Sequence, residues 1–189
     1  MKRKILAVLG SPRKKGYSTY LAQSAIKMLE KEGAEVETIK LYDLEIQACT
    51  ACDSCRKPKS DFCIIQDDMK PLYRKILQAD SVLLSCPIYW FSVNAKMKLF
   101  IDRFYAFNTE KTEALKGKSF SIILSYGDVD PYSSGAVNAI RMFEDAFKYT
   151  DSRIGKILYK TEVPVKDRDL KGDLGGDLVE LSKSLLVQE

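Results

Sequence analysis

The sequence contains no histidine, which is the commonest general base in enzymes and the commonest nitrogen ligand for zinc and copper. This absence excludes hydrolases that depend on a Ser-His or Cys-His pair. No apolar run is long enough to cross a membrane, and the short run that follows the basic start stops at Gly10, too early for a signal peptide. We therefore expect a cytoplasmic protein without a membrane partner.

Strong charge of either sign is also lacking, because the net charge of the 189 residues is only +4. The basic residues are not gathered into a patch with interleaved aromatic residues, so a nucleic-acid partner is not expected. A mildly basic surface suits the binding of phosphate-bearing nucleotides. The length and the hydrophobic fraction of 46% predict a single domain over residues 1–189.

Four of the five cysteines are clustered, and Cys86 stands apart as an expected buried residue at a strand end. The cluster consists of Cys49, Cys52, Cys55 and Cys63, with the spacing C-x2-C-x2-C-x7-C. The first three match the spacing with which one loop holds three corners of a [4Fe–4S] cluster, and Cys63 would be the fourth ligand. Four cysteines that bind no metal are as well supported by the sequence as a [4Fe–4S] cluster. Zinc ranks third, because structural zinc usually takes its ligands as separated pairs.

Short β-branched or apolar segments alternate with helical patterns along the chain, which is typical of a parallel sheet. The predicted strands are 4–10, 35–41, 81–86, 119–125 and 153–159. The predicted helices are 18–32, 68–78, 94–104, 136–147 and 177–186. In the first helix we expect Ser18 as the N-cap and Gly33 as the stop signal. This alternation fits either the Rossmann strand order or the flavodoxin order 2-1-3-4-5.

The loop after the first predicted strand has features of a phosphate site. It runs from Gly10 to Thr19 and leads directly into a helix, whose first N–H groups and positive dipole end favour an anion. The loop matches neither the Walker motif nor the G-x-G-x-x-G of dinucleotide folds, so ATP and tightly held NAD are disfavoured. An ordinary capped turn is the alternative interpretation.

Two further loops carry aromatic residues at predicted strand ends. Residues 86–92 read Cys-Pro-Ile-Tyr-Trp-Phe-Ser, and residues 126–135 begin with Tyr-Gly-Asp. Adjacent rings next to a proline-fixed turn favour a stacked planar ligand over simple core packing. In the order 2-1-3-4-5 these two loops and the first loop converge at the switch point of the sheet.

With these motifs in view, the chain resembles the NAD(P)H-dependent FMN reductase and iron-sulfur flavoprotein family over nearly its whole length. The markers are Gly-Ser-Pro-Arg at 10–13, the cysteines at 49–63, Asp-Asp-Met at 67–69, Pro-Ile-Tyr-Trp at 87–90, and Lys-Leu-Phe-Ile-Asp-Arg at 98–103 with Tyr105. The resemblance implies an α/β fold: a flavodoxin-like three-layer sandwich whose five-stranded parallel sheet has the order 2-1-3-4-5. It also implies homodimers or homotetramers, with which exposed rings at Trp90, Phe91, Tyr105 and Phe107 would be consistent.

The resemblance implies FMN as cofactor. It places the phosphate at Ser11, Arg13, Gly16, Ser18 and Thr19, and the isoalloxazine ring against Pro87, Ile88, Tyr89, Trp90, Phe91, Tyr126, Gly127 and Asp128. Family members commonly carry Asn where this chain has Tyr17, so one contact to the phosphate is expected to be absent or replaced. Simple reductases of the family resemble this chain in keeping the cysteines without an established cluster.

The leading functional hypothesis is an oxidoreductase in which NAD(P)H, as co-substrate, delivers hydride to FMN, and the flavin then reduces a flavin, a quinone or another small-molecule acceptor. No catalytic side chain is assigned, because the flavin performs the chemistry. The alternative is an electron carrier between redox proteins that uses FMN and a [4Fe–4S] cluster. The pI of about 8.7 argues against that alternative, since carrier flavodoxins are acidic. A zinc-binding interaction domain leaves the aromatic loops unexplained.

Overall fold

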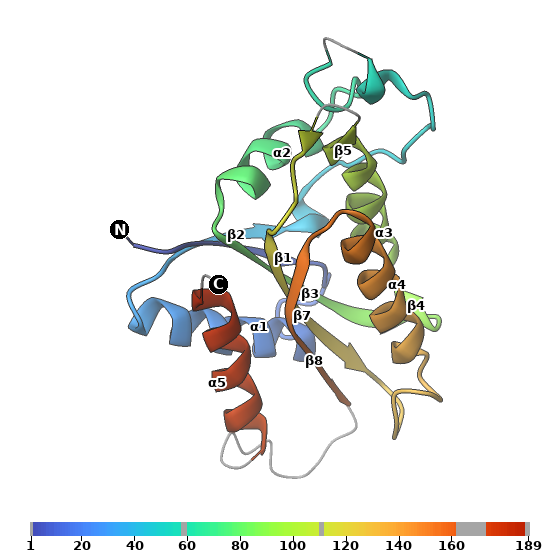
Figure 1. Ribbon diagram of the computed structural model, residues 1–189. Helices are drawn as coiled ribbons and strands as arrows, with labels where there is room; N and C mark the ends of the chain where they lie inside the picture. The colour runs from blue at the N-terminus through green and yellow to red at the C-terminus, as the bar shows by residue number, and fades with distance from the viewer. Residues whose placement is uncertain (1, 58–59, 110–111, 162–172, 188–189) are drawn as a thin grey trace.

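The centre of the computed structural model is a parallel sheet of five strands, β1 (Lys4–Leu9), β2 (Glu35–Lys40), β3 (Ser81–Tyr89), β7 (Ser119–Tyr126) and β8 (Arg153–Thr161). The structure describes residues 2–57, 60–109, 112–161 and 173–187. The strands lie in the order β2-β1-β3-β7-β8, and every neighbouring pair is parallel (Figure 1). Numbered by these five strands, this is the order 2-1-3-4-5, which confirms the predicted fold class.

The predicted count of five strands is too low, because a sixth short strand joins the sheet. This strand, β4 (Ser92–Val93), pairs antiparallel with the end of β3. The strand β3 itself continues through Pro87 to Tyr89, beyond its predicted end at residue 86. Proline lacks the N–H that a residue of a central strand donates, so Pro87 indicated the end of the strand in the sequence. A separate two-stranded sheet joins β5 (Asn108–Thr109) and β6 (Thr112–Glu113).

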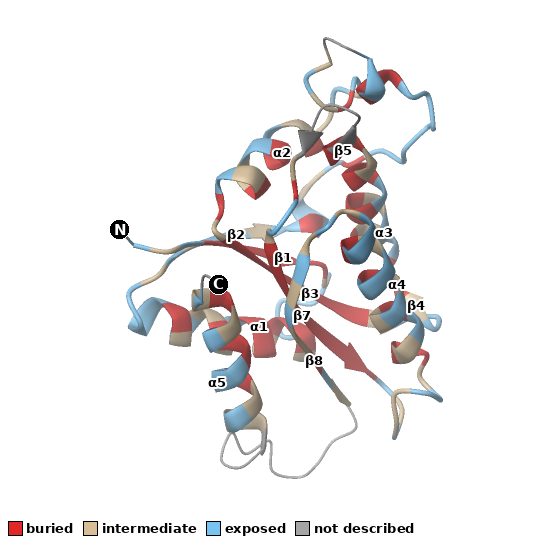
Figure 2. Cartoon of the chain, viewed as in Figure 1, coloured by how far each residue is buried: buried red, intermediate tan, exposed pale blue. Residues whose placement is uncertain are grey.

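Helices cover both faces of the sheet, which gives the predicted three layers (Figure 1). On one face lie α1 (Tyr17–Lys31) and α5 (Asp173–Leu186), and on the other lie α2 (Met69–Gln78), α3 (Ala95–Asp102) and α4 (Ala136–Tyr149). Alternate residues of β1 supply the two cores: Ile5, Ala7 and Leu9 face α1, whereas Leu6 and Val8 face the other layer. The buried residues accordingly concentrate between the layers (Figure 2).

The predicted N-cap of the first helix and the predicted start of the last helix are wrong. The N-cap of α1 is Gly16 rather than Ser18, which lies inside the first turn, although Gly33 does end the helix with a φ of +85°. The helix α5 begins at Asp173, four residues before the predicted start at 177, and includes Gly175 and Gly176. Packing of Leu178, Leu181 and Leu185 against the sheet outweighs the low helix propensity of glycine.

Short 3₁₀ turns connect the main elements, namely η1 (Leu41–Asp43), η2 (Ser54–Arg56) and η3 (Arg103–Phe107). Phe107, predicted to be exposed, is only 1% exposed and packs edge-on against Tyr73 and Phe104. It is therefore a core residue, and Tyr105 is half-buried. Cys86 is buried, as predicted, and burial raises its pKa to about 12.

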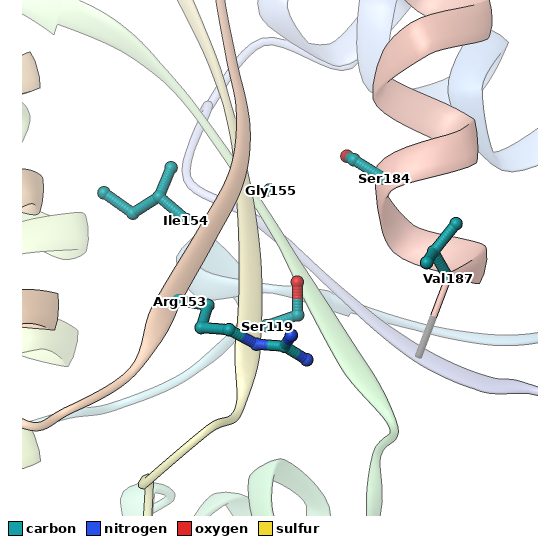
Figure 3. Close-up of a pocket in the computed structure, with 6 residues that line it drawn as sticks. All are labelled: Ser119, Arg153, Ile154, Gly155, Ser184 and Val187. Atoms are coloured by element: carbon teal, nitrogen blue, oxygen red, sulfur yellow. The ribbon is translucent and has the colours of Figure 1, made fainter. Parts of the chain in front are cut away.

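A cavity of about 260 Å³ lies at the amino ends of β7 and β8, beneath α5 (Figure 3). Ser119 and Arg153, the first residues of the two strands, face Ser184 and Val187 across it. Ligands of open α/β sheets bind at the carboxyl ends of the strands, so this cavity lies at the wrong edge for a nucleotide. Within the described ranges, no helix combines the length and apolar character needed to span a membrane.

Candidate functional site

The three loops singled out in the sequence leave the sheet at the same edge. They follow β1, β3 and β7, which are consecutive neighbours in the sheet. From β1 the chain passes through α1 to β2 on one side, whereas β3 lies on the other side, so the switch point falls between β1 and β3 (Figure 1). This is the edge at which doubly wound sheets bind their ligands.

The first loop folds around the carbonyl group of Arg13. That oxygen accepts hydrogen bonds from the N–H of Gly16 and from Oγ1 of Thr19, both at 3.0 Å. The N–H of Arg13 in turn donates to Oγ of Ser11 at 3.2 Å. The loop is compact, while the side chains of Arg13, Lys14 and Lys15 stay exposed and supply positive charge beside the start of α1.

Gly16 allows the loop to close tightly on the helix. A Cβ at this position would lie 3.0 Å from Oγ of Ser11 and 3.1 Å from Cβ of Arg13. As N-cap it brings no side chain to the first turn, and among the described residues no side chain caps α1. Several of the first N–H groups of α1 thus remain available to an anion.

Ser18 carries an unusual polar group. Its residue is only 1% exposed, and its Oγ has no hydrogen-bond partner in the described part of the chain. Buried hydroxyl groups are normally paired, because burying one without a partner costs about 1–3 kcal/mol. An unpaired hydroxyl in the first turn of a helix, next to free N–H groups, fits a site for a phosphate oxygen.

Two buried residues that sequence reasoning missed hold this loop in place. Asn94, the N-cap of α3, donates from Nδ2 to the carbonyl of Gly10 and accepts at Oδ1 from the N–H of Met97 at 3.0 Å. Ser85 accepts from the N–H of Gly10 at 2.6 Å and donates from Oγ to the carbonyl of Ser18 at 3.0 Å. A serine inside the apolar strand β3 is the one signal that could have pointed to such a contact.

The second loop is the turn between β3 and β4. Tyr89 pairs with Ser92, so Trp90 and Phe91 are the two central residues of a tight hairpin. Trp90 is 93% exposed and Phe91 53%, and their rings meet edge-on at 5.8 Å between centroids. Pro87 is buried and Ile88 half-buried within the strand. This turn thus exposes three adjacent aromatic residues, Tyr89, Trp90 and Phe91, and their contact with a planar ligand stays a prediction.

The third loop is built around two aspartates. The hydroxyl of Ser133 donates to Asp130 at 2.7 Å, and the N–H groups of Ser133 and Tyr132 donate to it at 3.0 and 2.7 Å; these hydrogen bonds lower the pKa of Asp130. The carbonyl of Asp128 accepts from Oγ1 of Thr161. Tyr126 is buried at the end of β7, and burial raises its pKa. Gly127 and Asp128 follow it at the sheet edge.

The cysteine loop occupies a different place, away from the three loops (Figure 1), where Asp53 and Arg56 form hydrogen bonds with Tyr105 of η3. Cys49 and Cys52 are exposed, Cys55 and Cys63 are buried, and all four are free thiols. Burial and the nearby Cys63 raise the pKa of Cys55, whereas hydrogen bonding with Ser54 lowers the pKa of Cys52. The loop contains left-handed backbone at Ala51, Asp53 and Phe62.

The base of this loop is closed by a clamp of charged residues. Asp67 accepts from the N–H of Gln47 at 2.9 Å, and Asp68 accepts from the N–H of Glu45 at 2.7 Å. Arg103 completes the clamp: its guanidinium binds Asp67 at 2.6 Å and the carbonyl of Gln47 at 3.0 Å. The side chains of Arg103 and Asp67 are 1% and 3% exposed, so this ion pair is fully buried.

The donor chemistry of the two candidate cofactor sites differs. The first loop fits the phosphate of FMN, because it offers an unpaired hydroxyl and free helix N–H groups beside cations. The cysteines match thiolate chemistry, but no set of three or more His, Cys, Asp or Glu residues in the described ranges is arranged to hold a metal ion. A preassembled metal cage is therefore not found, and the [4Fe–4S] assignment stays a prediction.

Comparison with solved structures supports the fold. The NAD(P)H:quinone oxidoreductase from Methanothermobacter marburgensis superposes with a TM-score of 0.72 at 16% identity, covering 100% of this chain and 98% of that chain. At this identity the likeness concerns the fold alone.

Comparison with curated sequences supports the family. An iron-sulfur flavoprotein of Archaeoglobus fulgidus is 38% identical over 126 residues, covering 67% of this chain and 56% of that protein. An iron-sulfur flavoprotein of Methanocaldococcus jannaschii is 31% identical over 144 residues, which cover 76% of this chain and 70% of that protein. The chain thus spans little more than half the length of the first relative. The family model described as NADPH-dependent FMN reductase matches residues 3–147. From this match and from the relatives it follows that the chain belongs to the NADPH-dependent FMN reductase family.

Proposed function

We propose that this protein is an FMN-dependent oxidoreductase that takes hydride from NAD(P)H and reduces a flavin, a quinone or another small acceptor. The hydroxyl of Ser18, which has no partner among the described residues, carries the proposal, because it supports an anionic ligand at the first turn of α1. Membership of the FMN reductase family supports FMN as that ligand. The predicted set of phosphate and ring contacts remains part of this proposal.

Each of the three loops would bind a different part of FMN. The N–H groups of α1, Ser18 and Thr19 would hold the phosphate, and Arg13 would add positive charge. Trp90 and Phe91 would flank the isoalloxazine ring, with Tyr126 and Asp128 on the neighbouring strand end. FMN, when bound, would supply the hydride and electron transfer, so the protein would have to orient the reaction partners and would not need a side-chain base.

Binding also requires a small movement. The Oγ of Ser18 is closed to solvent in this conformation, so we expect a phosphate oxygen to reach it only if the exposed residues 12–15 shift outward. The carbonyl of Arg13 now takes the hydrogen bonds of Gly16 and Thr19, and a phosphate would compete for those same donors. A charged phosphate oxygen is a stronger hydrogen-bond acceptor than the carbonyl oxygen of Arg13, so this exchange favours the FMN-bound state.

Replacement of Ser18 tests this function. Hydrogen bonds to charged groups contribute about 1.5–3 kcal/mol, so Ser18→Ala should weaken FMN binding by about tenfold to a hundredfold. The same change should leave the melting temperature of the FMN-free protein unchanged or higher, because the hydroxyl is unpaired. Ser24→Ala is the matched control, since Ser24 Oγ donates to Tyr20 O further along α1. Unaltered FMN affinity in folded Ser18→Ala protein would move the phosphate elsewhere.

The second candidate function is an electron carrier with a cluster in the cysteine loop. The burial of both Cys55 and Cys63 supports it, as does the raised pKa of Cys55, which its burial and the nearby Cys63 cause. The relatives named iron-sulfur flavoproteins support it as well. In that case redox proteins would be the partners. For either function we propose a homodimer or homotetramer, because a second copy would cover the exposed Trp90 ring.

A further inference from the structure

The turn that carries Trp90 and Phe91 has an unfavourable backbone conformation. Their φ angles are +46° and +65°, so both central residues of this two-residue hairpin are left-handed. Such turns normally have Asn or Gly at these positions, since a bulky side chain is strained there. Strain of this kind persists only where the surrounding structure enforces it.

The first turn of α4 provides that enforcement. Gly135, its N-cap, lies against Phe91 so closely that a Cβ on Gly135 would be 2.5 Å from both Cα and Cβ of Phe91 and 2.7 Å from its carbonyl oxygen. Three residues later, Nδ2 of Asn138 donates to the same carbonyl at 3.1 Å. The backbone of Phe91 is thus held between a glycine surface and a side-chain donor.

These contacts connect two of the three loops at the candidate site. Gly135 ends the loop after β7, and Phe91 belongs to the loop after β3. The helix α4 therefore determines where the aromatic turn stands relative to the carboxyl edge (Figure 1). The sequence analysis placed Phe91 and Gly135 in two separate loops, and nothing in those motifs indicated that the two residues touch.

We propose that Gly135 and Asn138 are positioning residues that hold the Trp90–Phe91 turn in the conformation that receives the isoalloxazine ring. This inference rests on the proposed function, since it assumes that the turn lines the FMN site. Both residues act through the backbone of Phe91 and do not themselves contact the flavin. Their loss should therefore disturb the turn first and FMN binding as a consequence.

Trp90 makes the test direct, because it is the only tryptophan in the chain. Intrinsic fluorescence anisotropy of the FMN-free protein reports the mobility of the turn, and quenching of the same signal during an FMN titration reports binding. The variants are Gly135→Ala and Asn138→Ala. Gly33→Ala is the control for the first, since Gly33 also has a positive φ but a Cβ there would have no atom within 4 Å. Glu144→Ala, on the exposed side of α4, is the control for the second.

We expect Asn138→Ala to lower the anisotropy of Trp90 and to weaken FMN binding about threefold to tenfold, the equivalent of one net hydrogen bond. Gly135→Ala should have a larger effect on both signals, and the two controls should match the wild type. If Gly135→Ala fails to fold, the anisotropy and FMN affinity of Asn138→Ala alone test the inference. Wild-type anisotropy and FMN affinity in a folded variant would overturn the inference.

The outcomes also separate this inference from the proposed function. Should the wild-type protein fail to bind FMN, the proposed function fails, while the anisotropy of the variants still shows whether α4 holds the turn. Should FMN bind normally to variants whose Trp90 has become mobile, the turn does not position the ring and only the present inference fails. Lower anisotropy combined with weaker binding supports both.

Discussion

Removal of the charge of Asp67 should strongly destabilise the protein. The carboxylate accepts four hydrogen bonds: from Nη1 and Nη2 of Arg103 at 2.6 and 3.3 Å, from the N–H of Gln47 at 2.9 Å and from the N–H of Met69 at 3.1 Å. Asp67→Asn would leave the guanidinium of Arg103 buried without its counter-ion. Breaking a buried pair in this way costs about 3–5 kcal/mol.

The loss of unfolding free energy in Asp67→Asn can be converted into a decrease in melting temperature. With an unfolding entropy of about 2 cal/mol/K per residue, a chain of this length loses about 8–13 °C for 3–5 kcal/mol. The control is Asp61→Asn, because Asp61 pairs with Arg74 at 3.1 Å but both side chains are largely exposed, at 64% and 70%. Exposed pairs contribute at most about 1 kcal/mol, so the control should shift the melting temperature by no more than about 3 °C.

The dependence on pH provides an independent check. Burial opposes ionisation of Asp67, but the hydrogen bonds from Arg103 and Gln47 outweigh it and hold its pKa below the ordinary value. A lowered folded-state pKa means that the stabilisation is complete above the unfolded pKa of about 4 and is lost as the pH falls through the folded pKa. Asp67→Asn should therefore flatten the loss of stability below about pH 4.

Urea denaturation and calorimetry measure both quantities. The double variant Asp67→Asn/Arg103→Met should be more stable than Asp67→Asn alone, because it also removes the unpaired cation. If Asp67→Asn behaves like Asp61→Asn, at neutral and at acid pH, the buried pair contributes little and the reasoning is refuted.

Two further predictions concern the aromatic turn and the cysteine loop. Replacement of Trp90 by Ala should change the absorption of bound flavin or its reduction by NAD(P)H more than the melting temperature, and a change in stability alone would make Trp90 an interface residue. In metal-free protein, Cys49 and Cys52 should react rapidly with a thiol reagent and the three buried cysteines slowly. Anaerobic reconstitution should protect the two fast thiols and yield stoichiometric iron and sulfide if the loop binds a [4Fe–4S] cluster; substoichiometric iron and sulfide would leave the flavin reductase without a cluster.

Much of the fold was predictable because its main signals are local. Each of the five parallel strands has a short apolar or β-branched run, and alternation with helices implies the parallel sheet. The order of the strands followed from the family resemblance, since alternation alone fits two topologies. The turn at Trp90 and Phe91 could not be recognised, because its residues are the opposite of those that favour a two-residue hairpin.

The candidate site was predictable as a set of loops but not as a set of contacts. Ser18 was interpreted as a helix cap from its residue type, whereas the structure places it two positions after the N-cap Gly16, and its hydroxyl has no partner in the described part of the chain. Asn94 and Ser85 act through backbone carbonyls of distant segments, and such partners leave no periodic pattern in a sequence. The burial of Phe107 was also missed, because the rings that cover it, Tyr73 and Phe62, come from distant parts of the sequence.

The clamp at the base of the cysteine loop has a consequence for the reactivity of the thiols. Because Asp67, Asp68 and Arg103 fix both ends of the segment 48–66, most of the entropy of loop closure is lost before any ligand arrives. Four thiols on one tethered segment have a high effective concentration toward one another. A ligand that needs several of these thiols would therefore have to rearrange only the loop between the clamped ends, and we expect the strands beneath to keep their register.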